Sequence, residues 1–372
     1  MHVGRRPLLK GLLAAAGIAG VSAVATGCVD GRRIEVGSPA PYTPPPPGID
    51  ELYRADALSR TTVLLASLSA PGAAAAFTID GASEAGAALA DLPRQWAEDL
   101  GAHERALQTG AEAEASAAAS DGGASAGSQT LANSQNPESP SASADAPASE
   151  PASPASLARA LADLRDLYAF GAIQVSGTLA RLFASAGSWC TWALSRLTRL
   201  ASALGIDVQA PEAPALGALI PTRDVPANDP PVATAASELT ALLPGAQTAE
   251  WEAAYTLEVV ASRDSGEARS RLVGWVAVHR ERAEAYGEVA SAVGLEPVRR
   301  EAGYPLPSPL DAARLTALTR EVSFTSLTNA IALTYGAPFT HRAPFVAAWL
   351  TEAGNYAEIA AGLESLPGLE SD

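Results

Sequence analysis

The stretch LARALADLRDLYAFGAIQVSGTLARLFA, residues 157–184, decides the fold class. Its apolar side chains recur every three or four residues, which places them on one face of an α-helix. These positions are Leu157, Leu161, Leu164, Tyr168, Ala172, Val175, Leu179 and Leu182. A helix with one apolar face is stable in water only when that face packs against other helices. The stretch therefore predicts an all-α protein built as a helical bundle.

The same spacing recurs along the chain. Further helices are predicted at 50–68, 91–109, 189–204, 248–263, 267–293, 308–335 and 343–363. The small residues 185–188 are interpreted as a break before the helix at 189–204. We expect an antiparallel four-helix bundle at 246–369 and a second helical bundle from 49–110 and 157–205. Whether the two halves arose by duplication stays open.

The first residues resemble an export signal. Arg5 and Arg6 are followed by an apolar run to Ala25 and by the sequence Ala-Thr-Gly-Cys ending at Cys28. This pattern is similar to a twin-arginine signal joined to a lipoprotein box, with Cys28 as the lipidated residue. A retained membrane helix is the alternative, but the run is short for a span of about 20 residues. We therefore predict a signal peptide at 1–27 and a protein exported and anchored to the outer face of the cell membrane.

The charge of the chain limits its partners. Lys and Arg total 25 and Asp and Glu total 41, which gives a net charge of −16. Nucleic acid is excluded as a partner, because phosphate binding requires clustered cations. An acidic chain is also not attracted to an anionic membrane surface. The lipid on Cys28 must then supply the membrane attachment.

Three segments have compositions unsuited to regular structure. Residues 28–48 are rich in proline and predict an extended tether. Residues 111–156 consist mainly of Ala, Ser, Glu, Gly and Pro, too polar to bury a core, and predict a disordered insertion. Residues 206–245 contain repeated prolines and predict an irregular connector between the two bundles.

Four short motifs in the C-terminal third carry a family resemblance. They are EWEAAY at 250–255, HRERAE at 279–284, AGYPLPSP at 302–309 and LPGL at 366–369. In this order and spacing they resemble the actinobacterial ferritin-like family of unknown function, DUF4439, over about residues 245–369. The resemblance implies an antiparallel four-helix bundle. It brings no established activity.

Ferritin-like bundles that hold a di-iron centre use Glu-x-x-His on two helices. None of His103, His279 and His341 has Glu three residues before it. The resemblance implies a Glu-His pair at the start of the first helix, but Trp251 occupies the histidine position. Metal ligands remain a hypothesis for Glu250, Glu258 and His279, with Glu352 or Glu358 as further carboxylates. His279 is alternatively a hydrogen-bonded packing residue on the apolar face of its helix.

The other distinctive residues favour structural roles. Cys190 stands between two tryptophans and is interpreted as a buried thiol, with a reactive thiol as the alternative. The six tryptophans are expected in the core, although a ligand pocket lined by them is also considered. Glu281, Glu284 and Glu288, which neighbour Arg280 and Arg282, are interpreted as a solvated face.

No nucleophile elbow, phosphate-binding glycine loop or zinc spacing occurs in the sequence, so an enzyme is not expected. No cofactor is expected either. The predicted function is a cell-surface lipoprotein whose non-catalytic ferritin-like bundles bind or support an unidentified envelope protein or small ligand. The alternative is a metal-binding ferritin-like protein with an atypical, partly lost ligand set.

Overall fold

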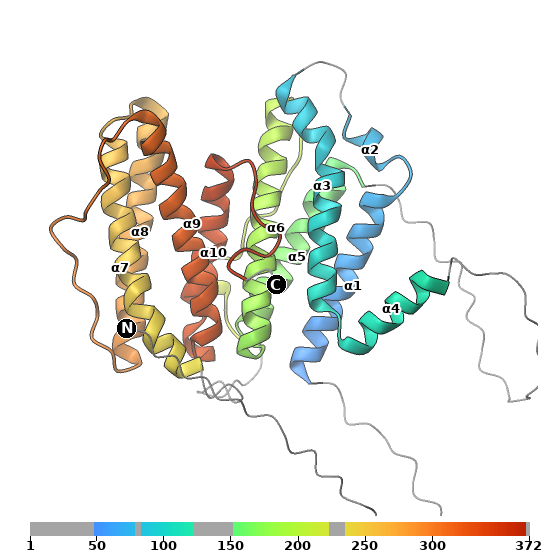
Figure 1. Cartoon of the computed structure of the whole chain (residues 1–372), viewed down its shortest axis with the longest axis horizontal. Coiled ribbons are helices and arrows are strands. Elements are labelled where there is room, and N and C mark those ends of the chain that lie inside the picture. Colours follow the sequence, from blue (N-terminus) through green and yellow to red (C-terminus); the bar gives the residue numbers. More distant parts are fainter. Residues whose placement is uncertain (1–47, 79–82, 123–151, 223–234, 370–372) are drawn as a thin grey trace, which may run out of the picture. The chain divides into compact units, whose positions relative to one another are not determined.

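A computed structural model describes residues 48–78, 83–122, 152–222 and 235–369. Their regular structure consists of ten α-helices and two short 3-10 helices (Figure 1), which confirms the all-α prediction. No helix in these ranges is both long enough and apolar enough to cross a membrane. The predicted signal peptide, Cys28 and nearly all of the tether lie outside the described residues.

Six helices form the N-terminal half. They are α1 (Ile49–Ser69), α2 (Ala73–Ala76), α3 (Glu84–Leu107), α4 (Gly110–Gly122), α5 (Pro154–Ala172) and α6 (Gly177–Ala203). Helix α1 packs against α3 and α5, α3 packs against α6, and α5 runs along α6. The chain segments before and after the predicted insertion therefore pack together.

Four helices form the C-terminal half. They are α7 (Ala235–Ala261), α8 (Gly266–Ala292), α9 (Ala312–Gly336) and α10 (Ala343–Ile359). The short helices η1 (Leu216–Ala218) and η2 (Phe339–His341) precede α7 and α10. Helix α7 packs against α8 and α9, and α9 packs against α10. The predicted start of helix α9 at Ser308 is too early. The helix begins at Ala312, after Asp311, whose side chain caps it by accepting a hydrogen bond from the Arg314 amide (2.8 Å).

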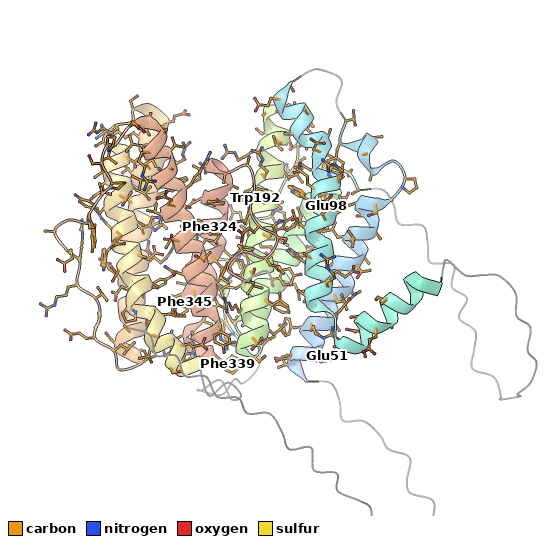
Figure 2. The ribbon with its side chains drawn as sticks, viewed as in Figure 1. Glu51, Glu98, Trp192, Phe324, Phe339 and Phe345 are labelled. Atoms are coloured by element: carbon orange, nitrogen blue, oxygen red, sulfur yellow. The ribbon has the colours of Figure 1, made fainter. Side chains whose placement is uncertain are left out.

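The two halves share one core. Helix α6 lies beside α10 (Figure 1) and packs against both α9 and α10. One apolar cluster extends from Ala57 to Ala357. Trp192, labelled on α6 in Figure 2, is one of its side chains. It donates to the Ala360 carbonyl beyond α10 (3.3 Å). Buried side chains of α6, α9 and α10 therefore join the two halves.

Buried polar contacts also join the halves at one end. Arg342, just before α10, donates through Nε to the Ala337 carbonyl (2.9 Å). Its Nη1 donates to the carbonyls of Ala172 and Val175, where α5 turns into α6. One side chain thus holds the turn between α5 and α6 against the turn between α9 and α10.

The chain after α10 crosses the N-terminal half. Ser185 on α6 donates to the Pro367 carbonyl (2.8 Å). His103 on α3 lies with Nε2 2.5 Å from the Ser365 carbonyl oxygen. The LPGL motif at 366–369 is therefore positioned by residues of the other half.

The structure corrects the position of one helix break. The break expected at 185–188 does not occur, because α6 continues through it, and the chain turns at 173–176 instead. A Cβ atom on Gly187 would lie 2.7 Å from the Trp349 ring and 3.0 Å from Tyr168 Cβ. The small residues of this stretch therefore permit close helix packing and do not end the helix.

The segment 111–156, predicted to be disordered, is helical at both ends. Residues up to Gly122 belong to α4, and α5 begins at Pro154. Ser153 caps α5 by accepting a hydrogen bond from the Ser156 amide (3.2 Å), and proline is favoured in a first helical turn. The rest of the segment, 123–151, lies outside the described residues.

The connector predicted at 206–245 ends earlier than expected. Helix α7 begins at Ala235 and passes through Pro244. Leu243 and Ala246 on either side of this proline are buried in the core. The free energy gained by packing these side chains outweighs the cost of the one backbone hydrogen bond that proline removes from a helix.

Candidate functional site

A layer of buried polar side chains crosses the C-terminal half. Helix α7 supplies Glu250, α8 supplies His279 and Arg282, α9 supplies Ser323, and α10 supplies Glu352. All five side chains are buried, and Arg282, the most exposed of them, is 6% exposed. Charged groups in a protein interior are stable only when they are paired. We call these five residues the polar layer.

Short contacts connect the polar layer. His279 donates through Nδ1 to Glu250 Oε2 (2.7 Å), and its Nε2 lies 3.9 Å from Glu352 Oε2. Arg282 Nη1 lies 3.3 Å from Glu250 Oε1 and 3.0 Å from Glu352 Oε2. Ser323 donates through Oγ to Glu352. Arg282 thus bridges the carboxylates of α7 and α10.

The polar layer lies between two apolar clusters. On α7, Leu243 and Ala246 belong to the large core, and Ala254 and Leu257 belong to a smaller cluster of α7, α8 and α9. Glu250 stands between these two pairs in the sequence. On α8, Trp275 belongs to the smaller cluster and Tyr286 to the large core, and His279 and Arg282 lie between them in the sequence. The polar layer therefore interrupts an otherwise apolar interior.

The electrostatics of the layer follow from these contacts. Burial alone would raise the pKa of Glu250, but Arg282 and His279 outweigh burial and lower that pKa below its usual value. Burial alone would lower the pKa of Arg282. The negative charges of Glu250 and Glu352 outweigh the effect of burial and raise this pKa above its usual value. Glu250 is therefore held as a carboxylate and Arg282 as a cation.

Two donors of this region have no acceptor among the described residues. They are Arg282 Nη2 and the Tyr286 hydroxyl, both buried. Burial, and then the charge of Glu250, raise the pKa of Tyr286 well above its usual value, so the hydroxyl keeps its proton. A buried donor without an acceptor costs about 1–3 kcal/mol. Both donors are shut off from solvent and therefore carry a desolvation cost in the folded state.

The structure brings together only part of the predicted metal site. Glu250 and His279 are hydrogen-bonded, and Glu352 joins them. Glu258 lies farther along α7 and pairs with Arg280 at the surface. Glu358 lies 3.3 Å from Arg271, also outside the polar layer. Within the described ranges, no three His, Cys, Asp or Glu side chains are placed to hold a metal ion.

The sequence-based interpretation of Arg282 was wrong. Glu281, Glu284 and Glu288 are exposed, as expected for a solvated face, but Arg282 is buried. Its burial has a signal in the sequence, because it follows His279 by three residues and so shares the apolar face of α8. His279 is buried and hydrogen-bonded to Glu250, in keeping with its place on the apolar face of its helix.

The polar layer does not fit a metal ion as it stands. Metal ions bind carboxylate oxygens at about 2.0–2.6 Å. Arg282 Nη1 already lies within hydrogen-bonding distance of both Glu250 and Glu352. The guanidinium therefore occupies the space between the carboxylates and supplies the positive charge that a metal would bring.

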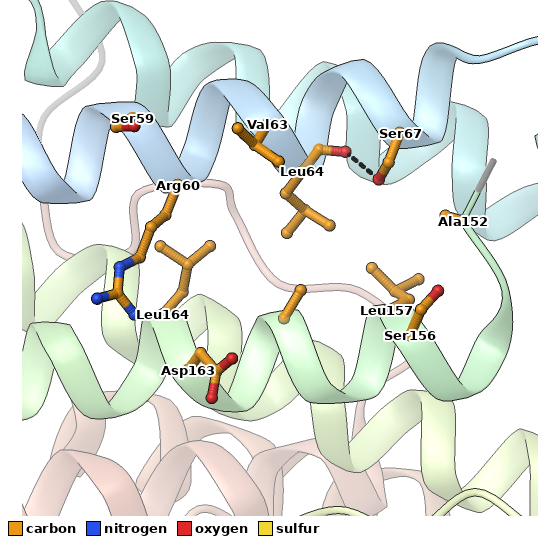
Figure 3. Close-up of a pocket in the computed structure, with 11 residues that line it drawn as sticks. Ser59, Arg60, Val63, Leu64, Ser67, Ala152, Ser156, Leu157, Asp163 and Leu164 are labelled. Carbon is orange, nitrogen blue, oxygen red and sulfur yellow. Dashed lines mark hydrogen bonds between the residues drawn. The ribbon is translucent and has the colours of Figure 1, made fainter. Parts of the chain in front are cut away.

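The described surface has hollows both away from the polar layer and beside it. Figure 3 shows a groove of about 390 Å³ between α1 and α5, lined by Val63, Leu64 and Leu157. Arg60 at its charged end already pairs with Asp56 (2.9 and 3.0 Å). A second hollow of about 430 Å³ lies between α8, α10 and the segment containing η1. Arg282 is among the residues that line the second hollow.

The remaining candidates are structural. Cys190 is a free, fully buried thiol whose pKa is raised by burial, which makes the reactive thiolate inaccessible. The six tryptophans are all buried and are confirmed as core residues.

Comparison with known families gives a match in the C-terminal third of the chain. The family model for DUF4439, a domain of unknown function, matches residues 243–371. This match confirms the resemblance to DUF4439 seen in the motifs. No curated protein and no solved structure matches the chain. The matched region contains all five residues of the polar layer, whereas α1–α6 lie outside it.

Proposed function

We propose that this protein is an exported lipoprotein, held at the outer face of the cell membrane by lipid on Cys28. Its helical bundles, of which the C-terminal one is ferritin-like, act as a non-catalytic binding or structural module of the envelope. The residues 5–28 support the membrane anchor. The polar layer supports the non-catalytic role.

The observation that carries the non-catalytic role is the position of Arg282. Its Nη1 lies 3.0 Å from Glu352 and 3.3 Å from Glu250. In a metal-carrying bundle, these inward carboxylates would have to remain free for the metal. Here a permanent cation neutralises them, and His279 is hydrogen-bonded to Glu250. Such a layer specifies how helices align and leaves no ligand set for redox chemistry.

The membrane anchor is tested with two cysteine variants of the full chain expressed in its host. Cys28→Ala is expected to move the protein from the membrane fraction to the soluble fraction. Cys190→Ala is the matched control, because Cys190 is buried and the protein should stay in the membrane fraction. Intact mass measurement should show a lipid on the wild-type chain. A Cys28→Ala protein that stays in the membrane at unchanged mass would refute the anchor.

The metal alternative is tested by elemental analysis. The full chain is purified without chelators and without an affinity metal, and its transition-metal content is measured by mass spectrometry. We expect no stoichiometric metal. A stoichiometric metal that disappears in His279→Ala would overturn the proposal and establish a metal protein with an atypical ligand set.

A further inference from the structure

A hollow of about 340 Å³ lies at the end of the C-terminal half where α7 turns into α8. Its apolar lining comes from four helices and consists of Val260, Leu272, Trp275, Leu315 and Ile359. All five residues belong to the smaller apolar cluster or pack against it. The volume falls in the range of small-molecule sites, which are apolar hollows with a few well-placed polar groups. We call this hollow the end pocket.

Two arginine side chains of the end pocket are open to solvent, so a ligand in the pocket can reach them. Arg263 lines the pocket, is exposed, and makes no ion pair or side-chain hydrogen bond with another described residue. Arg271 also lines it, with its guanidinium carbon 5.9 Å from the centroid of the Trp275 ring. The Arg271 side chain is 44% exposed, and its partner among the described residues is Glu358, 3.3 Å from Nε. The terminal nitrogens of both arginines therefore have N–H groups to donate beside an apolar wall.

The charges around the end pocket attract an anion, although the whole chain has a net charge of −16. Glu358 lies 3.9 Å from Arg199 as well as 3.3 Å from Arg271, so two arginines share one carboxylate. The acid in the lining itself is Asp264, which stands against Arg263 and Arg271. Three arginines are thus set against two acids. The excess of positive charge lies on the exposed side chains, where a ligand would meet it.

Guanidinium groups select among anions by their shape. A guanidinium group presents parallel N–H donors that match the two oxygens of a carboxylate. In the groove between α1 and α5, Arg60 already uses this geometry on both oxygens of Asp56. In the end pocket, by contrast, Arg263 has no carboxylate partner among the described residues.

We infer that the end pocket binds an amphipathic carboxylate, that is, a monoanion with an apolar chain or ring. The apolar part lies against Leu272, Trp275 and Leu315, and Arg263 and Arg271 donate hydrogen bonds to the carboxylate. The small excess of positive charge favours one negative charge on the ligand over two. This inference rests on the proposed binding role and names its ligand class.

The test uses octanoate as the probe and the full chain with Cys28→Ala, so that binding does not depend on a lipid. The protein is labelled with a fluorinated tryptophan, and Trp275→Phe assigns the fluorine NMR signal of Trp275. We expect octanoate to shift this signal to saturation and to leave the signals of the fully buried Trp96, Trp189 and Trp349 unchanged. Octanamide and octylammonium have the same chain without a negative charge. They are expected to bind at least about tenfold more weakly.

Two matched pairs of exposed positions locate the binding site. Arg263→Gln should weaken octanoate binding by about fivefold or more, whereas Arg269→Gln, outside the lining, should leave it within about twofold. Ala312→Phe places a ring in the pocket and should also weaken binding by about fivefold or more. Ala313→Phe adds the same ring at the next position, outside the lining, and should leave binding within about twofold.

Four results would each overturn the inference. They are no saturable shift of the Trp275 signal, equal or tighter binding of octanamide, equal effects of the two glutamine variants, and equal effects of the two phenylalanine variants. The membrane fractionation of the Cys28 and Cys190 variants does not involve the end pocket. A membrane-anchored protein that fails to bind octanoate would therefore reject this inference and leave the proposed lipoprotein role in place.

Discussion

Replacing Arg282 by methionine should be the most damaging change in the polar layer. The substitution keeps a long side chain but leaves Glu250 and Glu352 buried without their shared cation. Breaking a buried ion pair from one side costs about 3–5 kcal/mol, because the remaining charge has neither water nor a partner. His279 still donates to Glu250, so the loss falls mainly on Glu352, which retains Ser323.

Arg280→Met is the matched control, because Arg280 lies on the same helix and also pairs with a glutamate. Its partner is Glu258, and both side chains are more than a third exposed (36% and 40%). Exposed pairs contribute about 0–1 kcal/mol. With about 2 °C per kcal/mol for a chain of this size, we expect losses in melting temperature of about 6–10 °C for Arg282→Met and about 2 °C or less for Arg280→Met.

The assay is thermal unfolding of the full chain followed by circular dichroism. Adding Glu352→Gln to Arg282→Met should recover part of the loss, because the amide removes one unpaired charge. The damage should also be smaller in mildly acidic buffer, where an unpaired carboxyl group can take up a proton. Equal melting temperatures for Arg282→Met and Arg280→Met would refute the reasoning that the buried bridge stabilises the fold.

Two further predictions concern packing and pH. Gly187→Ala should destabilise the protein by about 1–3 kcal/mol, because its Cβ would lie 2.7 Å from Trp349. Gly354→Ala, whose Cβ would meet nothing closer than 3.8 Å, should stabilise the helix by about 0.5–1 kcal/mol, and denaturant unfolding compares the two. Burial raises the pKa of Asp99 from 3.8 to about 6, so ionisation of this half-buried group costs stability as the pH rises through that window. Asp99→Asn should therefore stabilise the protein at about pH 8 by about 1 kcal/mol after allowance for solvent screening, or about 2 °C in melting temperature. At about pH 3 it should leave the melting temperature unchanged, and a gain there would contradict this assignment.

The candidate site was predictable only in part from the sequence. Glu250 and His279 were singled out because they match the glutamate and the second-helix histidine that the family resemblance implies. Glu258 was added from the same helix, but eight residues place it more than two turns away, where it pairs with Arg280. Arg282 was missed because arginine among glutamates is typical of a solvated surface.

The apolar spacing determined by itself that this chain is helical, because a stripe repeating every three or four residues fits no other regular structure. The motifs determined that the C-terminal third matches DUF4439. The tertiary structure decided where the helices end and which charges are buried. Residues 185–188 continue α6 because Trp349 packs against Gly187, a contact between residues far apart in the chain. Arg282 is buried because carboxylates from two other helices neutralise it, and local sequence contains no information about such partners.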